Sequence, residues 1–261
     1  MNGDRWRWAI TWLAATLLAG CDGATPARPR LRVAAASDLQ EAMPVLVAAF
    51  RQGRDVDVDV TFGASGQLAE QIRQGAPFDV FLSANRGFVD RLAAEGTIKP
   101  GSARPYARGS LVLALNEIIN PRVATLADLA RPEVKTIAIA NPETAPYGMA
   151  AKQALERAGL WDALRPKLVP ADSVRQALRF VESGDAVAGL VGRSIAGVQG
   201  VRVVGLPADV CDPIIQSLGV VARSGRPDDA AAFADLVVGE VGLGILRRTG
   251  FSRVPDESGP R

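Results

Sequence analysis

The stretch LRVAAASDLQEAMPVLVAAFRQGRDVDVDVTFG at residues 31–63 sets the pattern that decides the fold. A short apolar run at 31–35 precedes a helical pattern at 39–50, in which apolar residues recur every three or four positions. A second strand is expected at 56–62, where apolar and polar residues alternate. The order strand, helix, strand is typical of a parallel sheet whose strands are joined by crossover helices.

The same alternation continues along the chain and then begins a second time. A helix at 68–74, a strand at 79–82 and a helix at 88–95 complete the first series. The remaining expected elements are strands at 111–115, 136–140, 187–191, 201–204 and 217–222, and helices at 125–129, 149–158, 174–182, 228–238 and 241–248. Two successive series predict an α/β chain with two lobes.

The chain is expected to cross between the lobes twice, near 108–112 and near 214–218. Lobe 1 would then hold residues 31–108 together with 217–255, because the last helices return to it, and lobe 2 would hold 109–216. We expect residues 256–261 to form a disordered tail.

The N-terminus has the pattern of an export signal. Arg5 and Arg7 precede an apolar run at 9–20, which is too short for a membrane span of about 20 residues. The run ends in Leu-Ala-Gly-Cys, which resembles a bacterial lipobox. We therefore expect residues 1–20 to be a lipoprotein signal peptide and Cys21 to be lipidated, which anchors the chain on the periplasmic or extracytoplasmic face of the membrane. Residues 21–30 are polar and contain proline, so they are expected to form a tether.

Composition removes several classes of function. The sequence contains no histidine, which excludes Ser-His-Asp and Cys-His catalysis and every histidine-based metal site. Its net charge is +2 and it has no basic stripe interleaved with aromatic residues, so we expect no nucleic-acid partner. Neither a GxSxG elbow nor a P-loop is present. We therefore expect no enzyme, and an exported hydrolase that works without histidine is the rival reading.

Four places where a strand or loop gives way to a helix carry small or hydroxyl-bearing residues. They are Ala36-Ser37-Asp38, Ala64-Ser65-Gly66, Ala145-Pro146-Tyr147-Gly148 and Ala171-Asp172-Ser173-Val174. A helix N-terminus carries unpaired N–H groups and about half a positive charge. Several such termini aimed at one cleft could hold a dianion without lysine or arginine. Each of them alone is equally the pattern of an ordinary helix cap.

Six blocks of the sequence resemble successive blocks of the periplasmic molybdate-binding protein family, in the family's order. They are LRVAAASDLQ at 31–40, TFGASGQLAEQI at 61–72, GAPFDVFLSAN at 75–85, NPETAPYGMAAKQALERAGL at 141–160, KLVPADSVRQALRFVESG at 167–184 and AVAGLV at 186–191. The resemblance spans about residues 31–253. It implies the type II fold of periplasmic binding proteins, in which each lobe is a mostly parallel sheet flanked by helices and the ligand cleft lies between the lobes.

The resemblance also implies which residues bind the oxyanion. It places hydroxyl donors at Ser37 and Ser65 and backbone N–H donors at Tyr147 and Val174, all four at the helix starts found above. Neighbouring positions are weaker candidates, namely Ala36, Gly66, Ser173, Gly192 and Arg193. There is one departure from the family, because some members place a tyrosine where this chain has Gly192.

The implied ligand is molybdate or tungstate, delivered to an ABC permease with its ATPase. No cofactor is expected, and metal is expected only within the bound oxyanion. Molybdate is a dianion without a proton to donate, so a cavity lined by donors alone suits it. A protonated phosphate would need an acceptor, and none is implied at the four positions. Sulfate, thiosulfate and phosphate are the alternative ligands, and we expect the protein to be a monomer.

Overall fold

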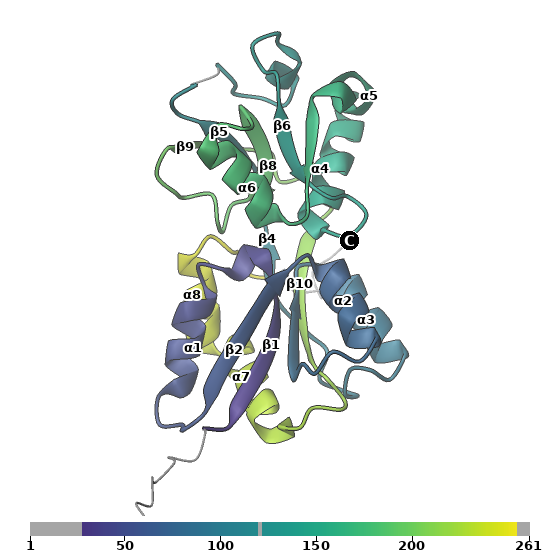
Figure 1. Ribbon diagram of the computed structural model, residues 1–261, viewed down its shortest axis with the longest axis vertical. Coiled ribbons are helices and arrows are strands. Elements are labelled where there is room, and N and C mark those ends of the chain that lie inside the picture. Colours follow the sequence, from purple (N-terminus) through teal and green to yellow (C-terminus); the bar gives the residue numbers. More distant parts are fainter. Residues whose placement is uncertain (1–27, 120–121, 255–261) are drawn as a thin grey trace, which may run out of the picture.

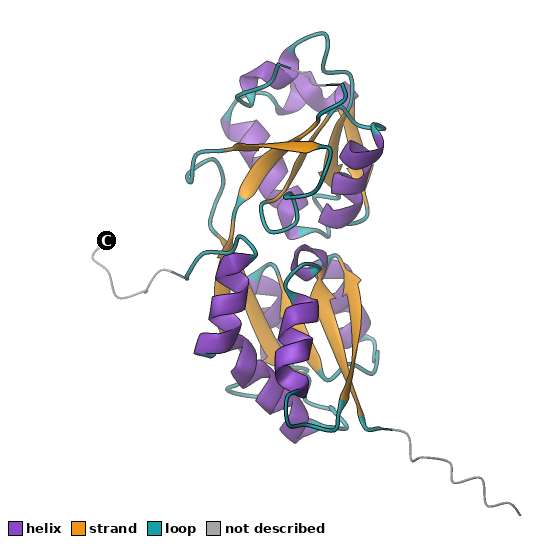
Figure 2. Cartoon of the chain, turned by 90° about the vertical axis from the view of Figure 1, so that its left-hand side faces the viewer, coloured by secondary structure: helices purple, strands orange, loops and turns teal. Residues whose placement is uncertain are grey.

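Two five-stranded sheets, each flanked by helices, organise the chain (Figure 1). The computed structural model describes residues 28–119 and 122–254. The predicted signal peptide at 1–20, the proposed lipidation site Cys21 and the predicted tail at 256–261 lie outside the described residues. The two sheets belong to separate lobes that face each other across a narrow waist (Figure 2).

The first sheet has the strand order β2-β1-β3-β10-β4, and all of its strands except β10 run in one direction. The strands are β1 (Arg30–Ala36), β2 (Asp57–Gly63), β3 (Val80–Ser83), β4 (Arg104–Gly109) and β10 (Ile214–Val220). Side chains alternate across β1, so Leu31 and Val33 face one layer of helices and Ala34 faces the other. The first layer contains α1 (Met43–Arg51), α7 (Pro227–Val238) and α8 (Glu240–Arg248), and the second contains α2 (Ser65–Arg73) and α3 (Arg86–Ala94).

The second sheet repeats this plan with the order β7-β6-β8-β5-β9, and here β5 is the reversed strand. Its strands are β5 (Leu111–Asn116), β6 (Ile137–Ala140), β7 (Leu168–Ala171), β8 (Ala188–Gly192) and β9 (Val201–Gly205). Its helices are α4 (Pro146–Arg157), α5 (Trp161–Leu164) and α6 (Val174–Ser183), with short 3-10 turns at η2 (Ala127–Ala130) and η3 (Arg165–Lys167).

Two short stretches connect the sheets. Ser110 alone separates β4 from β5, and residues 206–213 lead from β9 to β10. The two stretches lie side by side, because Ile214 pairs with Gly109. We propose that the lobes divide within these two stretches, so that they form the hinge.

The structure differs from the prediction at several elements, and the helix expected at 125–129 is the short 3-10 turn η2. The helix expected at 39–50 begins only at Met43, because Pro44 lacks an N–H group and fits best in a first turn. The preceding residues form a 3-10 turn instead, η1 (Ser37–Leu39). Strands β4 and β7 were absent from the prediction. Both lie at sheet edges and contain a proline, Pro105 and Pro170, which is tolerated there and obscures the strand pattern.

Candidate functional site

Four helix starts from the two lobes meet at one small cavity. Its lining residues are Ala36, Ser37, Asp38, Gly63, Ala64, Ser65, Ala84, Ala145, Pro146, Tyr147 and Val174. The four residues predicted as donors are all among them. Its volume is about 10 Å³, which corresponds to roughly one water-sized body. The lobes are in contact around it, since alanines from the first lobe pack into the apolar cluster of the second.

The helices that point at the cavity begin without side-chain caps. Ala36, Ala64 and Ala145 precede η1, α2 and α4, and none of these side chains accepts a hydrogen bond from the first turn. The alanine side chain has no hydrogen-bond acceptor, so it leaves N–H groups of these first turns available to donate to another partner. Helix α6 differs, because the Ser173 hydroxyl oxygen accepts from the Gln176 N–H at 3.3 Å.

The two serines of the cavity are set up to donate. Ser65 is completely buried, and its Oγ accepts from the Ala84 N–H at 3.0 Å. That contact occupies the hydroxyl as an acceptor and leaves its proton to donate. The Ser37 hydroxyl forms no hydrogen bond with any described residue. Together with the N–H groups at Tyr147 and Val174, the site offers donors from four chain segments.

Asp38 is the one carboxylate that lines the cavity among the described residues. Only 1% of it is exposed, and its Oδ2 accepts from Gln216 Nε2 at 2.7 Å. No lysine or arginine in the described part of the chain forms an ion pair with it. Burial raises the pKa of Asp38 to about 6, although the hydrogen bond from Gln216 and the nearby Tyr147 hydroxyl oppose that rise. Sequence reasoning gave the Asp38 carboxylate no role of its own, because nothing in its local pattern shows that a second lobe covers it.

The side chain of Tyr147 accounts for the departure at Gly192. A Cβ atom at Gly192 would lie 2.9 Å from Tyr147 Cζ, and one at Gly109 would collide with the Tyr147 hydroxyl. The tyrosine ring therefore occupies a slot that exists only because both positions are glycine. Burial, with the nearby charge of Asp38, raises the pKa of Tyr147 well above its ordinary value, so its hydroxyl stays protonated.

The weaker candidates separate into two groups. Ala36 lines the cavity, whereas Gly66, Ser173, Gly192 and Arg193 do not. The Gly66 N–H is already used, because it donates across the cleft to the Thr144 carbonyl oxygen at 2.9 Å. Arg193 lines a different cavity, together with Glu41 and Arg248.

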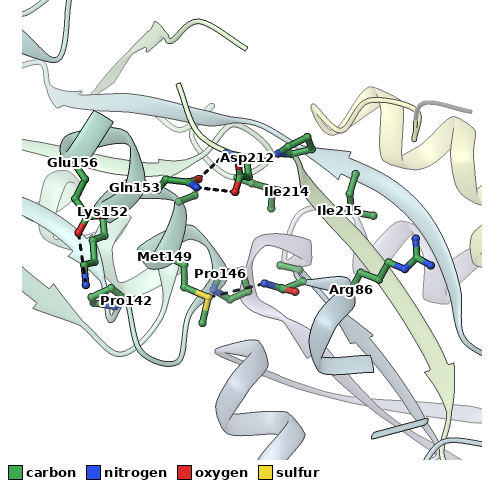
Figure 3. Close-up of a pocket in the computed structure, with 14 residues that line it drawn as sticks. Arg86, Pro142, Pro146, Met149, Lys152, Gln153, Glu156, Asp212, Ile214 and Ile215 are labelled. Carbon is green, nitrogen blue, oxygen red and sulfur yellow. Dashed lines mark hydrogen bonds and ion pairs between the residues drawn. The ribbon is translucent and has the colours of Figure 1, made fainter. Parts of the chain in front are cut away.

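A larger cavity of about 490 Å³ opens beside the hinge (Figure 3). Two pairs of its polar side chains interact with each other. Gln153 Nε2 donates to Asp212 Oδ2 at 2.7 Å, and Lys152 lies 3.8 Å from Glu156. The small cavity, where four helix starts converge, is the site that we propose for the ligand. Across residues 28–119 and 122–254 there is no cluster of acidic or cysteine side chains that could hold a metal ion, and no helix suited to crossing a membrane.

Comparison with known proteins places the chain in a family. The pattern of the bacterial extracellular solute-binding protein family matches residues 31–252. The chain belongs to this family. Its members are solute-binding proteins, which confirms the prediction that the chain is not an enzyme.

Individual members of this solute-binding family are similar over most of the chain. The molybdate-binding protein ModA of Rhodobacter capsulatus is 36% identical over 220 residues, which are 84% of this chain and 86% of that protein. The putative ABC transporter substrate-binding lipoprotein YvgL of Bacillus subtilis is 29% identical, over 90% of this chain and 93% of its own. The solved periplasmic molybdate-binding protein of Azotobacter vinelandii superposes with a TM-score of 0.79 at 31% identity, covering 87% of this chain and 100% of that one. This match confirms the predicted two-lobe type II fold.

Proposed function

We propose that this chain captures molybdate, and tungstate with it, outside the cytoplasmic membrane and delivers the ion to an ABC permease with its ATPase. The observation that carries the proposal is the convergence of Ser37, Ser65, Tyr147 and Val174 on one small, buried cavity. The similarity to two proteins named as molybdate-binding supports the same ligand.

Neutral donors suit this ligand for a physical reason. Molybdate and tungstate present four acceptor oxygens and no proton, so hydroxyl and N–H groups satisfy them completely. Helix N-termini add favourable partial charge where a lysine or arginine is missing. Sulfate has the same charge and shape but is smaller, so a rigid cage set for the larger ion would leave its hydrogen bonds stretched. Tungstate is nearly as large as molybdate and should bind about equally well.

Phosphate is the second candidate, and Asp38 is the observation that favours it. A buried carboxylate beside the cavity could accept the proton that a phosphate carries at neutral pH. Gln216 from β10 engages only Oδ2 of this carboxyl, so the similarity to proteins named as molybdate-binding decides the order of the two ligands. We therefore place molybdate first.

The cellular setting follows from the family and from the N-terminal sequence. Membership of an extracellular solute-binding family places the chain on the outer side of the cytoplasmic membrane. We propose lipidation at Cys21 as its anchor, and the similarity to a protein named as a lipoprotein supports this. We also propose that the protein works as a monomer.

Calorimetric titration of the chain from Asp22 onward tests the ligand. The protein should bind molybdate and tungstate tightly and respond weakly to sulfate and phosphate. Stronger binding of phosphate or sulfate would keep the importer role and overturn the ligand. No heat from any of the four ions would overturn oxyanion capture itself.

A further inference from the structure

A cluster of five buried polar side chains lies beside the oxyanion cavity, where the two lobes meet the hinge. We call Asp38, Tyr106, Tyr147, Ser194 and Gln216 the interlobe cluster; all five are buried. Asp38 directly follows the predicted ligand Ser37, so a contact from the second lobe to Asp38 also holds that lobe against the Ser37 donor. Buried polar groups are costly unless they are paired, which makes their partners informative.

The first lobe and the hinge hold one side of Asp38. Gln216 Nε2 donates to Asp38 Oδ2 at 2.7 Å, and the Tyr106 hydroxyl donates to Gln216 Oε1 at 3.1 Å. Tyr106 belongs to β4 and Gln216 to β10, the two strands that lead into the hinge. This half of the interlobe cluster lies within the first sheet and does not need the second lobe.

The second lobe holds the other side of Asp38. The Ser194 hydroxyl donates across the cleft to the Asp38 main-chain oxygen at 2.9 Å. Asp38 Oδ1, an acceptor, and the Tyr147 hydroxyl, a donor, are both buried. Neither forms a hydrogen bond with any described residue. A Cβ atom at Gly109 would meet both the Tyr147 hydroxyl and, at 3.1 Å, Gln216 Nε2, the atom that donates to Asp38, so the Tyr147 hydroxyl lies beside the Asp38 carboxyl.

We infer that Tyr147 and Ser194 are positioning residues that latch the second lobe onto Asp38 and thereby hold Ser37 against the bound oxyanion. The inference rests on the proposed function. Both contacts cross the cleft, so they exist only when the lobes are closed. They therefore slow the release of the ion and leave its first encounter with the open protein unchanged. In this arrangement the Tyr147 hydroxyl contacts Asp38, whereas the backbone N–H of Tyr147 donates to the oxyanion.

The test compares hydroxyl deletions on the two sides of the cleft. Tyr147→Phe and Ser194→Ala each remove one latch contact and keep the backbone donors. Tyr106→Phe is the matched control, because it deletes an equally buried hydroxyl of the same cluster that does not cross the cleft. Ser194→Thr restores the hydroxyl. Release of radiolabelled molybdate, chased with excess unlabelled molybdate, gives the dissociation rate, and filter binding at short times gives the association rate.

We expect Tyr147→Phe and Ser194→Ala to raise the dissociation rate about 5- to 50-fold, with the association rate changed less than twofold. Tyr106→Phe and Ser194→Thr should stay within about threefold of the original protein. Unchanged dissociation in both latch variants would overturn the inference while molybdate binding stands, and so would an equal increase in Tyr106→Phe. Failure of the unaltered protein to bind molybdate would overturn the proposed function and the latch with it.

Discussion

At the scale of single residues, the proposed site depends on two buried serine hydroxyls, Ser37 and Ser65. Replacing Ser65 by alanine removes the proposed donor and should weaken molybdate binding about 10- to 100-fold, or about 1–3 kcal/mol. Ser37→Ala should act similarly. Ser83→Ala is the control, because this buried hydroxyl donates to the Asn85 carbonyl oxygen at 2.7 Å and does not line the cavity. Calorimetry measures all three variants. Equal losses in Ser83→Ala would contradict the assignment.

The buried carboxyl of Asp38 makes a second prediction at this scale. Its pKa of about 6 lies above the ordinary 3.8, so the folded protein binds this proton more tightly than the unfolded chain does. The resulting stability is complete below about pH 4 and is lost as pH rises through about 6, a change of about 3 kcal/mol.

Asp38→Asn removes this titrating group. Comparing the variant with the unaltered protein therefore separates the effect of Asp38 from that of the other carboxyls. The difference in unfolding free energy between the two proteins, measured by urea denaturation from pH 4 to pH 7.5, should change by about 3 kcal/mol in favour of the variant. A difference that stays constant with pH would mean that Asp38 titrates normally.

At the scale of secondary-structure elements, the four helix starts differ in what their first residues do. Ser173 caps α6, so Ser173→Ala should lower the unfolding free energy by about 1 kcal/mol and change molybdate affinity little. Ser173→Asn should restore stability, since asparagine caps equally well. Thermal denaturation and calorimetry separate the two effects. A large loss of affinity with unchanged stability would instead make Ser173 a ligand.

The elements also show how far sequence reasoning reaches. A continuous run of apolar residues identifies the central strands, because β1 and β3 are buried by helices on both faces. It misses the edge strands β4 and β7, which contain prolines and are only partly buried. The helix starts that carry the proposed donors were predictable, because a helix start is a local pattern. Asp38, the Tyr147 slot and Ser194 were not, because each depends on contacts between segments that are far apart in the chain.

At the scale of the whole molecule, the two lobes touch beside the ligand through Gly66. A Cβ atom there would lie 2.7 Å from the Thr144 carbonyl oxygen of the opposite lobe. Gly66→Ala should therefore hinder closure and weaken molybdate binding at least 10-fold. Alanine favours the helix, so the stability of the ligand-free protein should not fall.

Gly244→Ala provides the matched control, because it also adds a methyl group to a helix but meets only arginine side-chain ends, at 3.7 Å and beyond. Its molybdate affinity should equal that of the unaltered protein. Small-angle X-ray scattering with and without molybdate reports closure. If the Gly66→Ala variant closes and binds molybdate normally, the contact between Gly66 and Thr144 is not the one that retains the ion.

The most direct test of oxyanion capture by helix starts is anomalous diffraction at the molybdenum edge from crystals grown with molybdate. We expect one strong peak between the Ser37 and Ser65 hydroxyls and the N–H groups of Tyr147 and Val174. A peak in the larger cavity beside the hinge, or none inside the cleft, would contradict it.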